Sequence, residues 1–79
     1  MDTLYRLQSI FRDVFGDPTL KITKETSPAN FPEWDSVAMV QIILATEEEF
    51  GIQLETDALA SIRSVADIAR LVENHPGDE

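Results

Sequence analysis

The sequence predicts an all-α protein: a four-helix bundle with a short third helix and a long loop between the first two helices. Apolar residues recur at intervals of three and four, the spacing that places them on one face of a helix. Glycine directly follows two of these segments, as it does at many helix ends. The chain has 79 residues and no cysteine, so a compact helical core must hold a single domain, residues 1–79, together without disulfides.

The first helix is predicted over residues 3–15. Its stripe of apolar residues at helical spacing consists of Leu4, Leu7, Phe11, Val14 and Phe15. Gly16 follows as a stop signal. The connection over residues 16–35 is long for a compact domain. We expect its apolar residues to pin it to the core, and these are Leu20, Ile22, Phe31 and Trp34.

The second helix is predicted over residues 36–50. Asp35 can accept hydrogen bonds from unpaired N–H groups of the first turn, which leaves the Ser36 hydroxyl facing solvent. One face carries the residues expected in the core, which are Met39, Ile42, Ile43, Thr46 and Phe50. The opposite face carries a second apolar strip with polar neighbours, which are Val37, Val40, Leu44, Gln41, Glu47 and Glu48. A helix that is apolar on both sides in so small a domain is expected to bind a partner with its spare side.

Three acids, Glu47, Glu48 and Glu49, stand at the carboxyl end of this predicted helix. The helix dipole is already negative there, so each acid costs roughly 0.3–1 kcal/mol at low salt. A sequence selected only for stability would place lysine or arginine at these positions. Recognition by a basic surface is our preferred interpretation of the three acids.

Two shorter helices are expected to complete the bundle. Thr56 can cap a brief third helix over residues 57–61. Ser64 and Asp67 have the spacing of a capping box, which places the start of the last helix at Val65. The apolar stripe of that helix extends the prediction to about residue 74.

The charge of the chain limits the kinds of partner that it can bind. Its formal net charge is −9, with 15 acidic and 6 basic residues, so nucleic acids and anionic membrane surfaces are repelled. Residues 33–62 contain no lysine or arginine, and their seven acids are Glu33, Asp35, Glu47, Glu48, Glu49, Glu55 and Asp57. This segment is therefore expected to bind a basic protein, although acids also simply keep small proteins in solution.

Nothing in the sequence indicates that the protein is an enzyme. There is no cysteine, and the one histidine, His75, has no plausible partner for a hydrolytic triad. The acids lack the spacing of a calcium loop, so no metal site is expected. No run is long enough to span a membrane and no signal peptide is evident, so we expect a monomeric, cytoplasmic protein.

Four features together resemble the acyl carrier proteins. They are the Asp35-Ser36-Val37 start of the second helix, its acidic end over residues 47–52, the long first loop, and the Ser64-Val65 start of the last helix. The resemblance covers residues 3–74, nearly the whole chain. It implies that Ser36 carries a 4′-phosphopantetheine arm, which a separate transferase moves from coenzyme A with magnesium. Acyl groups are then carried as thioesters on the terminal thiol of the arm.

The resemblance also assigns roles to the neighbours of Ser36. Asp35 would cap the helix and contact magnesium during arm transfer. The second helix would dock basic patches of the phosphopantetheinyl transferase and of acyl-loading, ketosynthase or acyltransferase enzymes. The positions that match the docking contacts of the family are Val37, Val40, Gln41, Leu44, Glu47 and Glu48.

The chain departs from typical fatty-acid carriers at several positions. Val37 stands where leucine is usual, and Ala38 and Gln41 stand where many carriers have acids. Trp34 before Asp35 resembles carriers of polyketide and other specialised pathways, including those of modified fatty acids. Two alternatives are a carrier for aminoacyl or other unusual cargo, and an unmodified helical adaptor for a basic protein.

Overall fold

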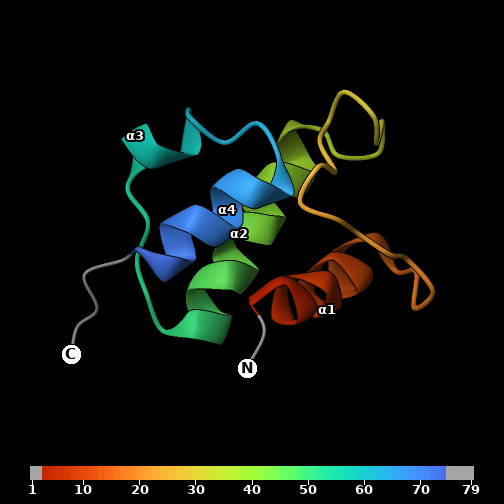
Figure 1. Ribbon diagram of the computed structural model, residues 1–79, viewed down its shortest axis with the longest axis horizontal. Helices are drawn as coiled ribbons and strands as arrows, with labels where there is room; N and C mark the ends of the chain where they lie inside the picture. The colour runs from red at the N-terminus through yellow and green to blue at the C-terminus, as the bar shows by residue number, and fades with distance from the viewer. Residues whose placement is uncertain (1–2, 75–79) are drawn as a thin grey trace.

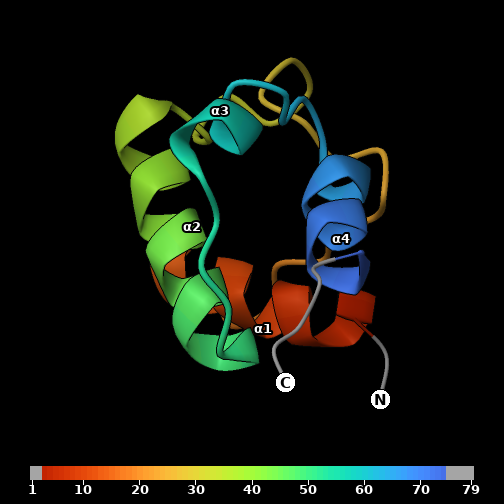
Figure 2. The same cartoon turned by 90° about the vertical axis from the view of Figure 1, so that its left-hand side faces the viewer.

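The computed structural model describes residues 3–74, which form four helices. They are α1 (Thr3–Phe15), α2 (Ser36–Phe50), α3 (Thr56–Leu59) and α4 (Val65–Glu73). In Figure 2, α2 and α4 stand on opposite sides, α1 crosses one end of the pair, and α3 lies at the other end. The predicted all-α class is confirmed, as are the predicted bounds of α1 and α2. His75 lies outside the described residues.

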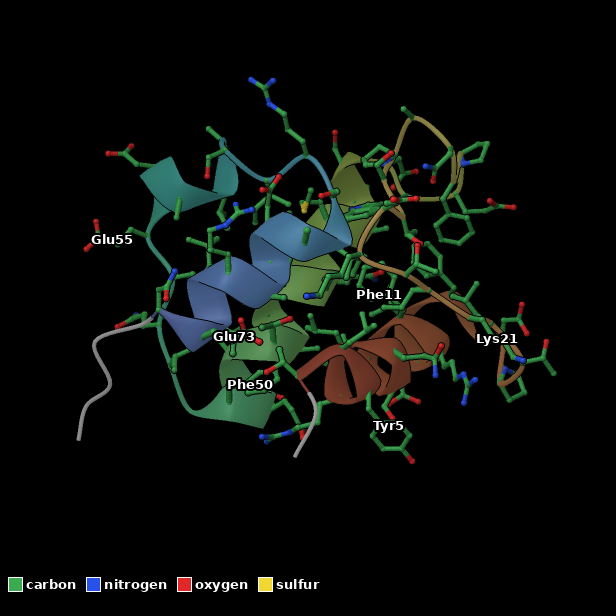
Figure 3. All side chains as sticks on the ribbon, viewed as in Figure 1. Tyr5, Phe11, Lys21, Phe50, Glu55 and Glu73 are labelled. Carbon is green, nitrogen blue, oxygen red and sulfur yellow. The ribbon has the colours of Figure 1, made fainter. Side chains whose placement is uncertain are left out.

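The core lies where α1, α2 and α4 meet. Phe11 and Leu7 of α1 are fully buried, and so are Ile42 of α2 and Ile68 of α4. Figure 3 shows Phe11 near the centre of the molecule and Tyr5, on the same helix, pointing away from it. The fully buried, close-packed side chains explain how a chain without disulfides holds its helices together.

The predicted core face of α2 is largely confirmed. Ile42, Ile43 and Thr46 are buried, whereas Met39 and Phe50 at its two ends are half-buried. The Thr46 hydroxyl donates to the Ile42 carbonyl at 2.7 Å, so the one polar side chain on this face is paired within its own helix.

The loop over residues 16–35, on the right of Figure 1, is attached to the core as predicted. Ile22 and Trp34 are buried. The Trp34 ring meets the Phe11 ring edge to face, with centroids 5.2 Å apart. Polar contacts with α1 hold the first part of the loop: Arg12 Nε donates to the Leu20 carbonyl at 2.7 Å, and the Gln8 side chain accepts from the loop backbone.

The same loop caps the start of α4. The N–H groups of Val65 and Ala66 donate to loop carbonyls of Thr26 and Lys24 at 2.9 and 3.0 Å. These carbonyls satisfy donors that a helix start leaves unpaired. This explains why so long a connection is ordered: its backbone forms part of the bundle.

The capping box predicted for α4 is only half present. The Ser64 side chain makes no capping hydrogen bond, because loop carbonyls already occupy donors of the first turn. Asp67 does reach back, but its Oδ2 accepts from the N–H of Arg63, at 2.8 Å. The predicted end of α4 is confirmed to within one residue, since Asn74 is the residue that follows the helix.

The prediction for the third helix is wrong in its bounds. The helix α3 begins at Thr56, so Thr56 is its first residue and Glu55 occupies the capping position. It ends two residues earlier than expected. The Ser61 hydroxyl donates to the Ala58 carbonyl at 2.7 Å, and this local bond competes with continuation of the helix.

Candidate functional site

The amino end of α2 places Ser36 on the surface of the molecule. Ser36 is the first residue of the helix and is exposed. The preceding Asp35 has an extended backbone, and its Oδ1 accepts from the N–H of Ala38 at 2.9 Å. The predicted helix cap is therefore confirmed, and the cap is made by the carboxylate and not by the serine.

The first turn of α2 leaves backbone donors beside the Ser36 hydroxyl. Asp35 accepts from the N–H groups of Ala38 and Met39, through its side chain and its carbonyl respectively. Among residues 3–74, the N–H groups of Ser36 and Val37 have no acceptor. Unpaired N–H groups at the positive end of a helix dipole favour a phosphate. The residues present thus fit a phosphodiester on Ser36.

A cleft of about 350 Å³ opens beside Ser36. It is lined by Pro28 from the loop, by Trp34 and Asp35 before the helix, and by Ser36 and Met39 of α2. The sequence prediction placed Trp34 in the core, and this is confirmed because its side chain is only 2 % exposed. The part played by Pro28 could not be read from the sequence, because it depends on how the loop folds over the helix.

The outward face of α2 presents the apolar strip that the sequence predicted. Val37 is 67 % exposed, Val40 56 % and Leu44 57 %. Gln41 and Glu48 are exposed beside them. The strip starts next to Ser36 and continues along the same helix, so a protein that covers it also lies close to the serine.

The three acids at the end of α2 have different surroundings. Glu47 is half-buried, and its Oε2 accepts from the N–H of Leu54 at 2.8 Å. Glu49 pairs with Arg6 of α1, whose Nε lies 3.0 Å from Glu49 Oε2. Glu48 makes no such contact within the described part of the chain and faces solvent. Recognition by a partner is therefore not needed to explain Glu47 and Glu49, and Glu48 remains the acid most open to one.

Arg6 also compensates the negative end of α2. Its Nη2 donates to the backbone carbonyl of Glu49 at 2.9 Å, and its guanidinium lies 4.3 Å from the centroid of the Phe50 ring. Gly51 follows with φ of 65°, a left-handed conformation that glycine adopts readily. The last turn of α2 has no basic residue of its own, so Arg6 of α1 supplies the positive charge that balances the helix dipole there.

No helix in residues 3–74 is long and apolar enough to cross a membrane. The same residues contain no group of three histidine, cysteine or acidic side chains placed to hold a metal ion.

Comparisons with known proteins agree with this geometry. The profile of the family described as "Phosphopantetheine attachment site" matches residues 6–72. An acyl carrier protein of Trieres chinensis is 36 % identical over 72 residues, which is 91 % of this chain and 90 % of that protein. One of Acidothermus cellulolyticus is 30 % identical over 73 residues, 92 % of this chain and 87 % of that protein.

A solved structure shares the fold. The solution structure of holo acyl carrier protein from Geobacter metallireducens has a TM-score of 0.82 and 32 % sequence identity, and the match covers 100 % of both chains. The matched region includes all four helices of this chain. This chain therefore belongs to the acyl carrier protein family, and it carries acyl groups on covalently attached 4′-phosphopantetheine.

Proposed function

We propose that Ser36 Oγ is the atom that holds the phosphopantetheine arm. The observation that supports this is the exposed Ser36 hydroxyl beside two unpaired N–H groups in the first turn of α2. When bound, the arm supplies a thiol on which acyl groups ride as thioesters. On attachment, the Ser36 Oγ–P bond forms, the bond from phosphorus to adenosine 3′,5′-bisphosphate breaks, and the hydroxyl proton goes to a base of the transferase.

The activating base is proposed to come from the transferase because Ser36 has none. The carboxylate of the neighbouring Asp35 accepts a backbone hydrogen bond as the helix cap. Asp35 is exposed, so its remaining oxygen is open to a magnesium ion bound by the transferase. We propose that this is its second role during arm transfer.

The exposed face of α2 is proposed to dock the partner enzymes. Its centre is Val40 and Leu44, with Val37 near the serine and Gln41 and Glu48 at the polar edge. Glu47 contributes negative charge from a half-buried position. The proposed partners are the phosphopantetheinyl transferase and acyl-loading, ketosynthase or acyltransferase enzymes with basic patches.

A specialised pathway, of the polyketide or modified fatty-acid kind, is proposed for the cargo. Ala38 is buried, so an acid at that position would have to enter the core, and Gln41 leaves the exposed face less negative. A 30 % identical relative from Mycolicibacterium aurum is a meromycolate extension acyl carrier protein. An aminoacyl or other unusual cargo is the alternative.

We further propose that residues 1–79 act as a single carrier domain, monomeric and cytoplasmic. The described helices share one core, and the cysteine-free chain suits a reducing compartment. Analytical ultracentrifugation of the arm-loaded protein tests the monomer, and a dimer at working concentration would contradict it.

The attachment is tested by intact mass. Incubation of the apo protein with coenzyme A, magnesium and a broad-specificity transferase is expected to add one phosphopantetheinyl mass. Ser36→Ala should abolish the gain. Ser9→Ala, which removes an exposed hydroxyl from α1, is the matched control and should retain it. A gain that survives Ser36→Ala would place the arm elsewhere.

A further inference from the structure

We propose that the cleft beside Ser36 binds the pantoyl part of the arm, the branched segment that directly follows the phosphate. Trp34, Met39 and Pro28 are its walls. This inference rests on the proposed attachment at Ser36. It adds a binding site for the arm, called the seat below, which the arm occupies when no partner enzyme holds it.

The position of the cleft makes this occupant the natural one. Ser36 itself lines the cleft, so the first atoms beyond its phosphate are held at the opening. A tethered group has a high effective concentration at a neighbouring site, and weak contacts therefore suffice to keep it there. The volume of about 350 Å³ is at the small end of ligand pockets, which suits one segment of the arm.

The chemistry of the walls matches that of the pantoyl segment. This segment has a carbon that bears two methyl groups, followed by a hydroxyl and an amide. Pro28, Trp34 and Met39 offer apolar surface to the methyl groups. Asp35 and Ser36 form the polar rim on the side from which the phosphate comes.

Trp34, one wall of the cleft, also has an unpaired donor. Its indole Nε1 is buried and has no acceptor within residues 3–74. A buried donor without an acceptor is uncommon in folded proteins, and phenylalanine would fill an apolar wall without leaving one.

This seat lies apart from the exposed apolar strip of α2 that is proposed to dock partner enzymes. Met39 is half-buried on the core side of α2, whereas Val40 and Leu44 point outward. An arm held against Trp34 and Met39 therefore leaves the outward strip free for a partner enzyme. Docking and arm release become separate steps.

The experiment uses arm-loaded protein whose two pantoyl methyl groups carry ¹³C. Nuclear Overhauser contacts are expected from these methyls to the Trp34 ring protons and to the Met39 methyl. Trp34 is the one tryptophan of the chain, so its indole N–H resonance and its emission are also read without ambiguity. Both should differ between apo and arm-loaded protein.

Two variants on α2 separate a specific seat from chance proximity. Met39→Ala removes one wall and should abolish the contacts to the Trp34 ring, whereas Leu44→Ala, on the outward face, should retain them. If intact mass shows the arm on Ser36 but the wild-type protein gives no methyl contacts and no change at Trp34, the seat is refuted and the attachment stands. If the arm is not on Ser36, both proposals fail.

Discussion

At the scale of single residues, Asp35 caps α2 and Ser36 stays exposed beside it. Serine is itself a common helix cap. Here, however, the Asp35 carboxylate accepts from the N–H of Ala38, and the serine remains exposed. The sequence predicted this arrangement because an aspartate immediately before an apolar run is a strong cap. It could not predict the unpaired indole N–H of Trp34, which depends on how the loop folds around that ring.

Asp35 is expected to contribute both to stability and to arm transfer. Asp35→Ala should lower the free energy of unfolding by about 1 kcal/mol, the usual cost of a lost helix cap, as measured by urea denaturation. Asp35→Asn keeps an oxygen that can cap but removes the charge. The Asp35→Asn protein should therefore be nearly as stable as the wild type, but the rate of arm transfer to it should be lower. Equal transfer rates for Asp35→Asn and wild type would contradict the magnesium role.

At the scale of elements, the helices with clear terminal signals were predicted well and the others less so. The bounds of α1 and α2 follow from long apolar stripes that end at Gly16 and Gly51. The helix α3 has only four residues, too few for a periodic pattern to show. The loop carbonyls that cap α4 and the Arg6 contact with α2 join segments distant in the chain, which no local pattern reveals.

Arg6 is expected to hold the carboxyl end of α2 in place. Arg6→Ala removes an exposed ion pair, a hydrogen bond to the Glu49 carbonyl and the stacking over Phe50. The expected loss in free energy of unfolding is about 1–2 kcal/mol. The control is Arg63→Ala, whose side chain is exposed and makes no contact of this kind in the described structure. Similar losses in the two variants would show that the Arg6 contacts contribute nothing specific.

The outward strip of α2 is expected to matter for partners and not for folding. Leu44→Arg puts a positive charge on an exposed position, so it should leave the urea midpoint nearly unchanged. Against a basic partner surface it should lower kcat/KM for arm transfer roughly tenfold. Tyr5→Arg makes the same change at an exposed position on α1 and should have little effect. If both variants lower kcat/KM equally, docking does not depend on this strip.

At the scale of the whole molecule, acidity and folding are coupled. The net charge of −9 favours solubility and basic partners. It also destabilises the compact state, because folding brings negative charges close to one another. Two carboxylates stabilise the fold more when ionised than when protonated, so their protonation favours acid unfolding. The N–H of Arg63 and the Arg70 guanidinium hold the pKa of Asp67 below its ordinary value of 3.8, and the hydroxyl and N–H of Thr19 do the same to the pKa of Asp17.

The Asp67 contacts predict a specific pH dependence of stability. Because its folded-state pKa is lowered, its contribution is fully present above the ordinary aspartate value of 3.8 and is lost as pH falls through the lowered value. The free energy of unfolding, measured by urea denaturation between about pH 5 and pH 2, should therefore fall less steeply with decreasing pH for Asp67→Asn than for the wild type. Ser9→Ala, at an exposed position that carries no carboxylate, should follow the wild-type slope. Identical slopes for Asp67→Asn and wild type would refute the linkage.

The measurement that bears most directly on the whole account is the chemical state of Ser36 in the protein isolated from its own cells. Intact mass followed by fragmentation of the peptide that contains residues 34–44 is predicted to find a phosphopantetheinyl group, with or without an acyl cargo, on the Ser36 oxygen. An unmodified Ser36 in protein from active cells, or the same group on any other residue, would contradict it.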